Sequence, residues 1–249
     1  MSVPHVAVSA LTHQGVLRDH NEDSVVMGPW TACASVTDTP ATLFFPIAAP
    51  LLVAVADGVG GHPAGDVASG MVAQELSRAG RTLTDEASVR AALDACNQSV
   101  YDAGMRDAER TGMGTTIAGI VVDETTVRVF NVGDSRVYAV DEHGLERLST
   151  DDNPPLTPGQ THTSVLTQML GGYAGDRRIN SHVSSRQRAD NCRYLVCTDG
   201  LSDVVSDDAI ASVMARGRGA EAAYELWRMA MEAGGPDNIT IAVVKPAEA

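Results

Sequence analysis

The hydrophobic positions along the chain follow two periods, one typical of strands and one typical of helices. Short apolar runs rich in β-branched residues predict strands. A spacing of three and four residues predicts helices over 64–78 and 86–110, and in the second of these Val89, Leu93, Cys96 and Val100 share one helical face. The predicted strands cover 6–11, 24–27, 51–56, 115–122, 126–132, 136–140, 179–184, 194–197 and 239–244.

The order of these elements indicates the fold class. Two more helices are predicted over 207–215 and 220–232. Strands arrive in groups with helices between the groups, and short turns join the central strands, so neighbouring strands should pair antiparallel. This order favours an α+β layered sandwich over a strictly alternating parallel sheet. No repeat or linker divides the chain, and we expect a single domain over residues 1–249.

Residues 39–56 carry no charge and approach the length of a membrane span. Pro40, Pro46 and Pro50 interrupt this stretch, and Asp57 ends it. Because proline breaks a helix, we interpret the stretch as a loop followed by a buried strand, with no membrane as partner. The first seventeen residues have no Lys or Arg before an apolar core, so no signal peptide is predicted.

Charge and cysteine usage indicate which partners and which redox compartment suit the chain. The chain has 32 acidic and 18 basic residues, a net charge of -14, which disfavours nucleic acid and anionic membranes as partners. Bound metal ions would still allow it to act on phosphate. The four cysteines show neither CxxC pairs nor a disulfide framework. They predict free thiols and a reducing, cytoplasmic location.

Acidic residues at the ends of apolar segments are the candidate metal ligands. Asp57-Gly58 and Asp199-Gly200 each follow a predicted strand, and Asp237 precedes the last one. Carboxylates held there suit hard cations such as Mg²⁺ and Mn²⁺. We expect the glycines to remove side chains that would block a ligand or ion. One Asp-Gly is most often a turn; three such segments indicate a metal site without settling its reaction.

Six ordered motifs extend this pattern from about residue 7 to residue 244. They are Thr12–Asp23, Asp57–Gly65, Gly112–Thr116, Gly133–Arg136, Asp199–Asp203 and Gly235–Asn238. In order and spacing the set resembles the PPM family of metal-dependent protein serine/threonine phosphatases (protein phosphatase type 2C), and its bacterial branch most. The resemblance implies a four-layer α-β-β-α sandwich, in which helices flank two antiparallel sheets and the metals sit in a cleft at one edge.

The resemblance also implies a core of two Mn²⁺ or Mg²⁺ ions. Asp57 matches the carboxylate that bridges both ions, and Gly58 supplies a backbone carbonyl to one of them. Asp199 and Asp237 match ligands of the first ion. Glu22 matches an acidic residue that serves the second ion, often through water.

Further roles follow from the same resemblance. Arg18 matches the arginine that grips the substrate phosphate through its two-pronged guanidinium. Asp23 matches a catalytic-site residue that supports the Glu22 shell. Asp134 and Asp203 match the pair that holds a third, weaker metal in some members.

The implied activity is hydrolysis of phosphoserine and phosphothreonine by direct attack of a hydroxide that bridges the two metals. No phosphoenzyme forms, so no cysteine or serine nucleophile is expected. The implied partners are phosphorylated proteins and a serine/threonine kinase with its targets, and we expect a monomer. Two alternatives are a catalytically inactive scaffold of the same fold and a small-molecule phosphomonoesterase. Retention of Arg18 and the three aspartates disfavours the inactive scaffold.

The chain departs from the family pattern in three places. Val59 stands where many eukaryotic members have a histidine, and His62 is a candidate general acid, although a buried or turn-stabilising role is favoured. The flap, about 151–165, is short and proline-rich. The insertion, about 29–50, is longer than usual; it is either a docking surface or a tolerated loop, and the loop is favoured.

Two acidic pairs have simpler interpretations. We expect Asp151-Asp152 to form a solvated turn and Asp207-Asp208 to start a helix.

Overall fold

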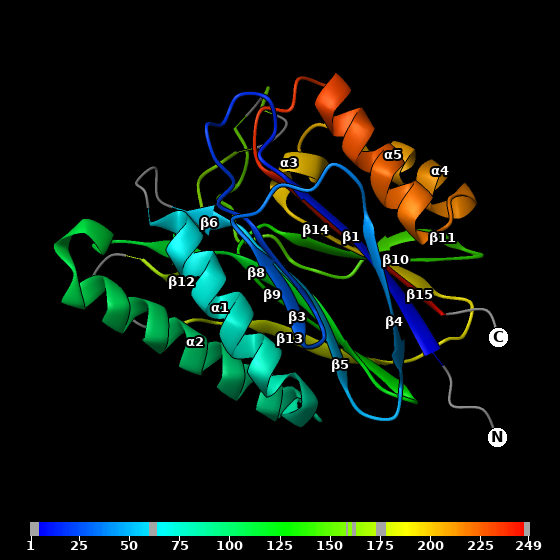
Figure 1. Ribbon diagram of the computed structural model, residues 1–249, viewed down its shortest axis with the longest axis horizontal. Helices are drawn as coiled ribbons and strands as arrows, with labels where there is room; N and C mark the ends of the chain where they lie inside the picture. The colour runs from blue at the N-terminus through cyan, green and yellow to red at the C-terminus, as the bar shows by residue number, and fades with distance from the viewer. Residues whose placement is uncertain (1–4, 60–63, 158, 161–162, 173–177, 247–249) are drawn as a thin grey trace.

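The computed structural model describes residues 5–59, 64–157, 159–160, 163–172 and 178–246, which contain two six-stranded antiparallel sheets (Figure 1). The first sheet runs in the spatial order β11 (Gly144–Arg147), β10 (Arg136–Asp141), β14 (Arg193–Cys197), β15 (Ile239–Pro246), β1 (His5–His13) and β4 (Ala41–Pro46). The second runs in the order β13 (His182–Gln187), β9 (Thr126–Val132), β8 (Ile117–Val122), β5 (Leu51–Ala56), β2 (Ser24–Met27) and β3 (Trp30–Cys33).

Helices cover the outer face of each sheet. Figure 1 shows α1 (Gly65–Ala79) and α2 (Glu86–Arg106) on one side of the sheets and α4 (Asp207–Arg216) and α5 (Gly219–Glu232) on the other. The short elements are β6 (Gly58–Val59), β7 (Gly114–Thr115) and β12 (Leu170–Gly171), which pair as a small sheet, with η1 (Gly80–Thr82), η2 (Ala108–Arg110) and α3 (Asp199–Ser202). The predicted α-β-β-α sandwich is confirmed.

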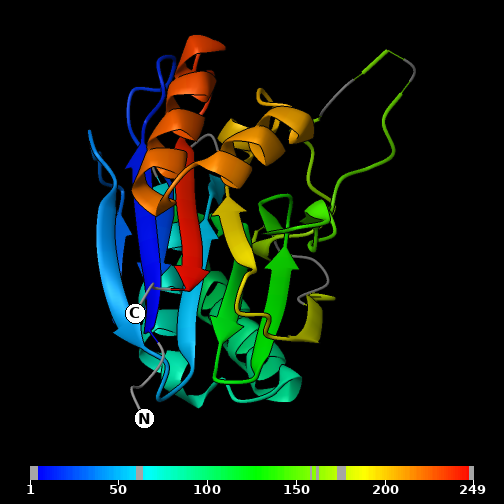
Figure 2. The same ribbon diagram turned by 90° about the vertical axis from the view of Figure 1, so that its right-hand side faces the viewer.

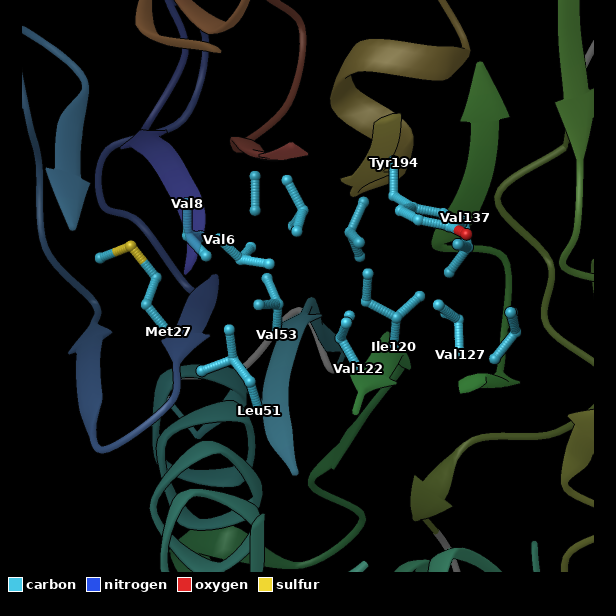
Figure 3. Packing of buried hydrophobic residues seen from close by; sticks show 14 of the residues in the cluster. Val6, Val8, Met27, Leu51, Val53, Ile120, Val122, Val127, Val137 and Tyr194 are labelled. Atoms are coloured by element: carbon cyan, nitrogen blue, oxygen red, sulfur yellow. The ribbon is translucent and has the colours of Figure 1, made fainter. Parts of the chain in front are cut away.

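The central core lies between the two sheets (Figure 3). Successive side chains of a strand point to opposite faces. Val53 and Val55 therefore enter this core, whereas Leu52 and Ala54 pack under α1 and α2. Both faces of β5 are buried, which explains why its sequence is a continuous apolar run without polar alternation. The same strand ends at the metal-site candidate Asp57.

The predicted elements match the structure closely, with small shifts at their ends. The second helix ends at Arg106 and is followed by η2, and the strand predicted over 179–184 lies over His182–Gln187. Asp207 and Asp208 occupy the first turn of α4, as predicted. No helix in the described ranges combines the length and apolar character that crossing a bilayer requires.

The interpretation of 29–50 as a loop was wrong. The segment contains β3 and β4, and each forms an edge of a different sheet by pairing with β2 and β1 respectively. Pro40 stands just before β4, and Pro46 is its last residue, opposite His5; both are positions that an edge strand tolerates. From Thr42 to Pro46 exposed and half-buried residues alternate along β4, as expected for an edge strand with one solvent-exposed face.

Candidate metal centre

One pocket gathers side chains that are far apart in the sequence. Seven of the predicted site residues line it: Arg18, Glu22, Asp57, Gly58, Asp134, Asp199 and Asp237. Two predicted residues, Asp23 and Asp203, do not line it. His62 falls outside the described residues.

The central strands bring the aspartates to one end of the sandwich. Asp57 follows β5, Asp199 follows β14 by two residues, and Asp237 stands two residues before β15. Strands β14 and β15 are antiparallel neighbours, so the end of one lies beside the start of the other. The backbone N–H of Thr198 donates to the Thr240 carbonyl at 3.1 Å and continues this pairing up to the site.

The backbone of Asp57 is fixed on both sides. Its N–H donates to Thr116 Oγ1 at 3.1 Å, and its carbonyl accepts from the Thr116 N–H at 2.9 Å and from Thr115 Oγ1 at 2.7 Å. With the backbone polar groups used in this way, the carboxylate is left to face the pocket. A rigid backbone under a ligand residue preorganises a metal site.

The glycines after the aspartates serve backbone packing. A Cβ on Gly58 would lie 2.4 Å from the Gly65 carbonyl oxygen, and one on Gly200 would lie 2.0 Å from the Asn238 carbonyl oxygen. Real Cβ atoms do not approach so closely, so both positions exclude any side chain. The expectation that these glycines clear the path of a ligand was wrong, because the missing side chains would point into neighbouring backbone.

Asn238 organises the loop that carries Arg18 and Glu22. Its Nδ2 donates to the carbonyls of Gln14 and His20, each at 2.9 Å. Its Oδ1 accepts from the Glu22 N–H at 2.8 Å. The sequence motif contained Asn238, but its role depends on contacts across more than 200 positions and was not predicted.

The carboxylates repel one another in this pocket. Burial is the main cause that raises the pKa of Asp57 well above its ordinary value, and the charges of Asp23 and Asp199 add to it. Burial likewise raises the pKa of Asp199, with Asp134 and Asp237 as further causes. Oδ1 of Asp199 is buried and has no hydrogen-bond partner in the described structure. A divalent cation would offset the repulsion and satisfy this oxygen, so these residues fit a metal ion.

Arg18 supplies positive charge at the mouth of the pocket. Its Nη2 lies 2.6 Å from Asp237 Oδ2, and the two side chains are 54% and 32% exposed. The hydrogen bond to Asp237 is the main cause that raises the pKa of Arg18. As the described residues are placed, no three His, Cys, Asp or Glu side chains stand close enough together to hold a metal ion. The aspartates line the pocket while Arg18 holds one of them.

Asp23 lies behind the pocket wall and is fully buried. Its Oδ2 accepts from Thr198 Oγ1 at 3.0 Å, and the Thr240 N–H donates to the same Thr198 oxygen at 3.0 Å. Burial raises the pKa of Asp23 to about 7, partly offset by hydrogen bonds from Thr240 and Thr198. This placement suits a residue that positions the loop and the β14 end, without contact to substrate.

Asp134 and Asp203 occupy different positions relative to the pocket. Asp134 lines it, is 7% exposed, and accepts from Asn153 Nδ2 at 3.0 Å. Burial raises the pKa of Asp134, and Asp203 is the next charge that does so. The backbone N–H of Asp203 donates to the Asp199 carbonyl at 2.8 Å, which places Asp203 in the turn below the first-metal candidate.

The base of the flap is anchored by two aspartates. Asp151 accepts from Arg136 and Arg147, with Nη2 of Arg136 at 2.8 Å. Asp152 is 9% exposed, accepts from the Gly133 N–H at 2.8 Å and pairs with His182 Nε2 at 2.8 Å. The predicted solvated turn was wrong, because both carboxylates have partners that only the fold brings close.

The described part of the flap borders the pocket. Ser164 of the flap and Leu166 just after it line the pocket, and Asn153 Nδ2 also donates to the Val165 carbonyl at 3.0 Å. Figure 2 shows the described stretches of this segment reaching away from the sandwich. Asn153 therefore joins the flap to Asp134.

Comparisons with known proteins agree with this geometry. The family model described as protein phosphatase 2C matches residues 44–233. Serine/threonine protein phosphatase PstP of Mycobacterium tuberculosis is 30% identical over 250 residues, which cover 94% of this chain and 44% of that protein. The chain thus spans less than half of that relative's length. Serine/threonine phosphatase stp of Listeria monocytogenes is 30% identical over 214 residues, covering 78% of this chain and 84% of that protein.

A solved structure gives the same result in three dimensions. The catalytic domain of PstP in complex with two manganese ions has a TM-score of 0.79 and 29% identity to this chain, covering 98% of this chain and 100% of that one. Three observations indicate the same family: the sandwich fold, the pocket at the strand ends and the matched family model. The chain belongs to the protein phosphatase 2C family.

Proposed function

We propose that this chain is a metal-dependent protein serine/threonine phosphatase that hydrolyses phosphoserine and phosphothreonine. The observation that carries the proposal is the meeting of Asp57, Asp199 and Asp237 with Arg18 in one pocket. Relatives that bear the name serine/threonine phosphatase, and the manganese ions of the PstP structure, support it.

In this proposal two ions, Mn²⁺ or Mg²⁺, bind at the aspartates. Asp57 would serve both ions, with the Gly58 carbonyl and Glu22 as further ligands, and Asp199 and Asp237 would complete the first site; all five residues line the pocket. A third ion would take Asp134 and Asp203. When bound, these cations supply Lewis acidity that activates water for attack on phosphorus and positive charge that offsets the phosphate oxygens.

Arg18 is the residue that binds the substrate phosphate in this proposal. Its guanidinium fork matches two phosphate oxygens, and a bidentate, charge-assisted pair fixes their orientation as well as their position. The side chain is 54% exposed, so it can turn from Asp237 toward a phosphate at the pocket mouth. Asn238 acts indirectly in this proposal, because it holds the loop that carries Arg18 and Glu22. Asp23 also acts indirectly, because it holds the end of β14 beside Asp199.

The proposal includes the setting of the reaction. The chain acts as one phosphatase domain and as a monomer in the cytoplasm, on proteins phosphorylated by a serine/threonine kinase. The free cysteines support a reducing compartment, since Cys96, Cys192 and Cys197 are buried without a disulfide. An inactive scaffold is disfavoured because the metal-site aspartates and Arg18 are all present in the pocket.

Hydrolysis of a phosphothreonine peptide tests the proposal. Purified chain is assayed with Mn²⁺, with Mg²⁺ and with EDTA, beside Asp199→Asn and the control Asp208→Asn, an exposed carboxylate in the first turn of α4. We expect turnover that requires metal, is lost in Asp199→Asn and persists in Asp208→Asn. Metal binding without hydrolysis of any phosphopeptide or small monoester would favour the scaffold, and hydrolysis of small monoesters alone would favour the small-molecule enzyme.

A further inference from the structure

A second groove lies at the opposite end of β5 and α1 from the metal centre. It is bordered by the connection between β4 and β5 and by the C-terminal end of α1 (Figure 1). Asp57 follows the last residue of β5, whereas the groove lies beside Leu51, its first residue. A strand of this length spans roughly 20 Å at about 3.3 Å per residue, which separates the groove from the pocket.

The floor of the groove is apolar and preformed. Phe45, Pro46, Pro50 and Leu51 line it. Gly28, in the turn before β3, has a φ of +60°, and a Cβ there would lie 2.9 Å from Leu51 Cδ1 and 3.3 Å from Phe45 Cε1. A glycine at this position therefore lets the Phe45 ring settle beside Leu51.

The end of α1 is tied to the same turn and carries two arginines. Ser77 Oγ donates to the Gly28 carbonyl at 2.9 Å, which holds the helix end against the floor. Arg78 and Arg81 line the groove, and neither guanidinium has an ion pair or hydrogen bond within the described structure. Arg136 and Arg228, by contrast, are each paired with carboxylates.

Charge complementarity defines what would occupy the groove. None of the described lining residues is acidic, although the chain as a whole has a net charge of -14. An anionic group is repelled by most of this surface and attracted at two unpaired arginines beside an apolar floor. The groove thus suits a segment that offers acidic and apolar side chains together.

We propose that this groove docks an extended segment of the phosphoprotein substrate. An acidic side chain of that segment pairs with Arg78 or Arg81, and a neighbouring apolar side chain rests against Phe45 and Pro50. The proposal rests on the protein phosphatase function proposed above and adds a second contact far from the phosphate. Such a contact raises the effective concentration of the phosphorylated residue at the pocket, so it lowers KM and leaves kcat unchanged.

Direct binding tests the groove without any hydrolysis. The probe is an unphosphorylated, fluorescein-labelled peptide of alternating Glu and Leu, followed by anisotropy, with a Lys-for-Glu peptide as its counterpart. We expect the acidic peptide to bind the full chain and to bind Arg78→Glu/Arg81→Glu about tenfold more weakly. Arg106→Glu, an exposed change at the end of α2, should bind like the wild type. Equal binding to wild type and double variant, or binding of the Lys peptide alone, would overturn the proposal.

Kinetics then separate docking from the phosphatase function. A short phosphothreonine peptide is compared with one that carries the Glu-Leu segment on a linker of about twelve residues, long enough to reach around the molecule at about 3.3 Å per residue. We expect the segment to lower KM at least about fivefold in the wild type and not in Arg78→Ala/Arg81→Ala, with equal kcat/KM for the short peptide. Failure to hydrolyse either peptide overturns the phosphatase function, whereas hydrolysis of both with equal KM overturns docking alone.

Discussion

Arg18 pairs with a carboxylate that the proposed function assigns to a metal ion. Nη2 of Arg18 lies 2.6 Å from Asp237 Oδ2, and Asp237 is a candidate ligand of the first metal. A cation that binds Asp237 would draw on the same negative charge and weaken this ion pair. We therefore predict that Arg18→Ala binds metal more tightly than the wild type while it hydrolyses phosphopeptide less well.

The two effects differ in size. Because the Arg18 side chain is 54% exposed, its ion pair is screened by solvent and contributes at most about 1 kcal/mol, so Mn²⁺ affinity should rise by up to about fivefold. Loss of a bidentate, charge-assisted contact to phosphate costs roughly 3 kcal/mol, which lowers kcat/KM on the order of a hundredfold. Arg18→Lys keeps a positive charge but loses the planar fork, so its kcat/KM should fall between the two.

Calorimetric titration with Mn²⁺ measures the first effect, and initial rates on a phosphothreonine peptide measure the second. Arg106→Ala serves as the matched control, since it removes an exposed arginine that does not line the pocket. Weaker Mn²⁺ binding by Arg18→Ala than by the wild type would refute the competition. An unchanged kcat/KM would remove Arg18 from phosphate binding.

Three other predictions concern stability and can be checked by thermal unfolding. Gly200→Ala should destabilise the chain by about 2 kcal/mol or more, because its Cβ would lie 2.0 Å from the Asn238 carbonyl oxygen. Gly70→Ala, whose Cβ would have no contact under 3.6 Å, should leave the stability unchanged. Equal Tm values for the two variants would contradict this prediction. In EDTA, Asp23 has a pKa of about 7 in the folded chain and about its ordinary value of 3.8 in the unfolded chain, so Tm should fall as pH rises between these values. Asp23→Asn should flatten this fall, and an equally steep fall in that variant would argue against Asp23 as its source. Saturating Mn²⁺ should raise Tm at pH 8, since it binds only the folded carboxylates, and an unchanged Tm would count against the metal site.

The sandwich was predictable because its central strands are buried on both faces. A run such as β5, in which every residue is buried, leaves a continuous apolar signal in the sequence. The edge strands β3 and β4 leave a weaker apolar signal, since their exposed faces admit polar residues and prolines stand at or beside their ends. Trp30 and Phe44 are 62% and 67% exposed, so hydrophobicity at these positions does not mark the core.

The site was predictable only where its residues stand in local motifs. Asp57 and Asp199 each end a strand of strong apolar pattern, and the pocket contains both. The anchors of the flap had no such mark, because His182 lies thirty positions from Asp152 and Asn153 lies nineteen positions from Asp134. Pairs of this kind depend on which loops the fold brings together, and a single sequence does not record that proximity.

The apolar core of the sandwich offsets the cost of gathering acidic residues in the pocket. Burial and mutual repulsion raise the pKa values of Asp57 and Asp199, so folding without metal holds these groups against their preference for charge and solvent. The strands that carry them are anchored by residues such as Val53 and Val196, which lie in the core between the sheets. Because that core holds the strand ends together, the carboxylates of the proposed metal site are gathered before any ion binds, and the free energy of binding a cation would go into affinity and not into ordering the site.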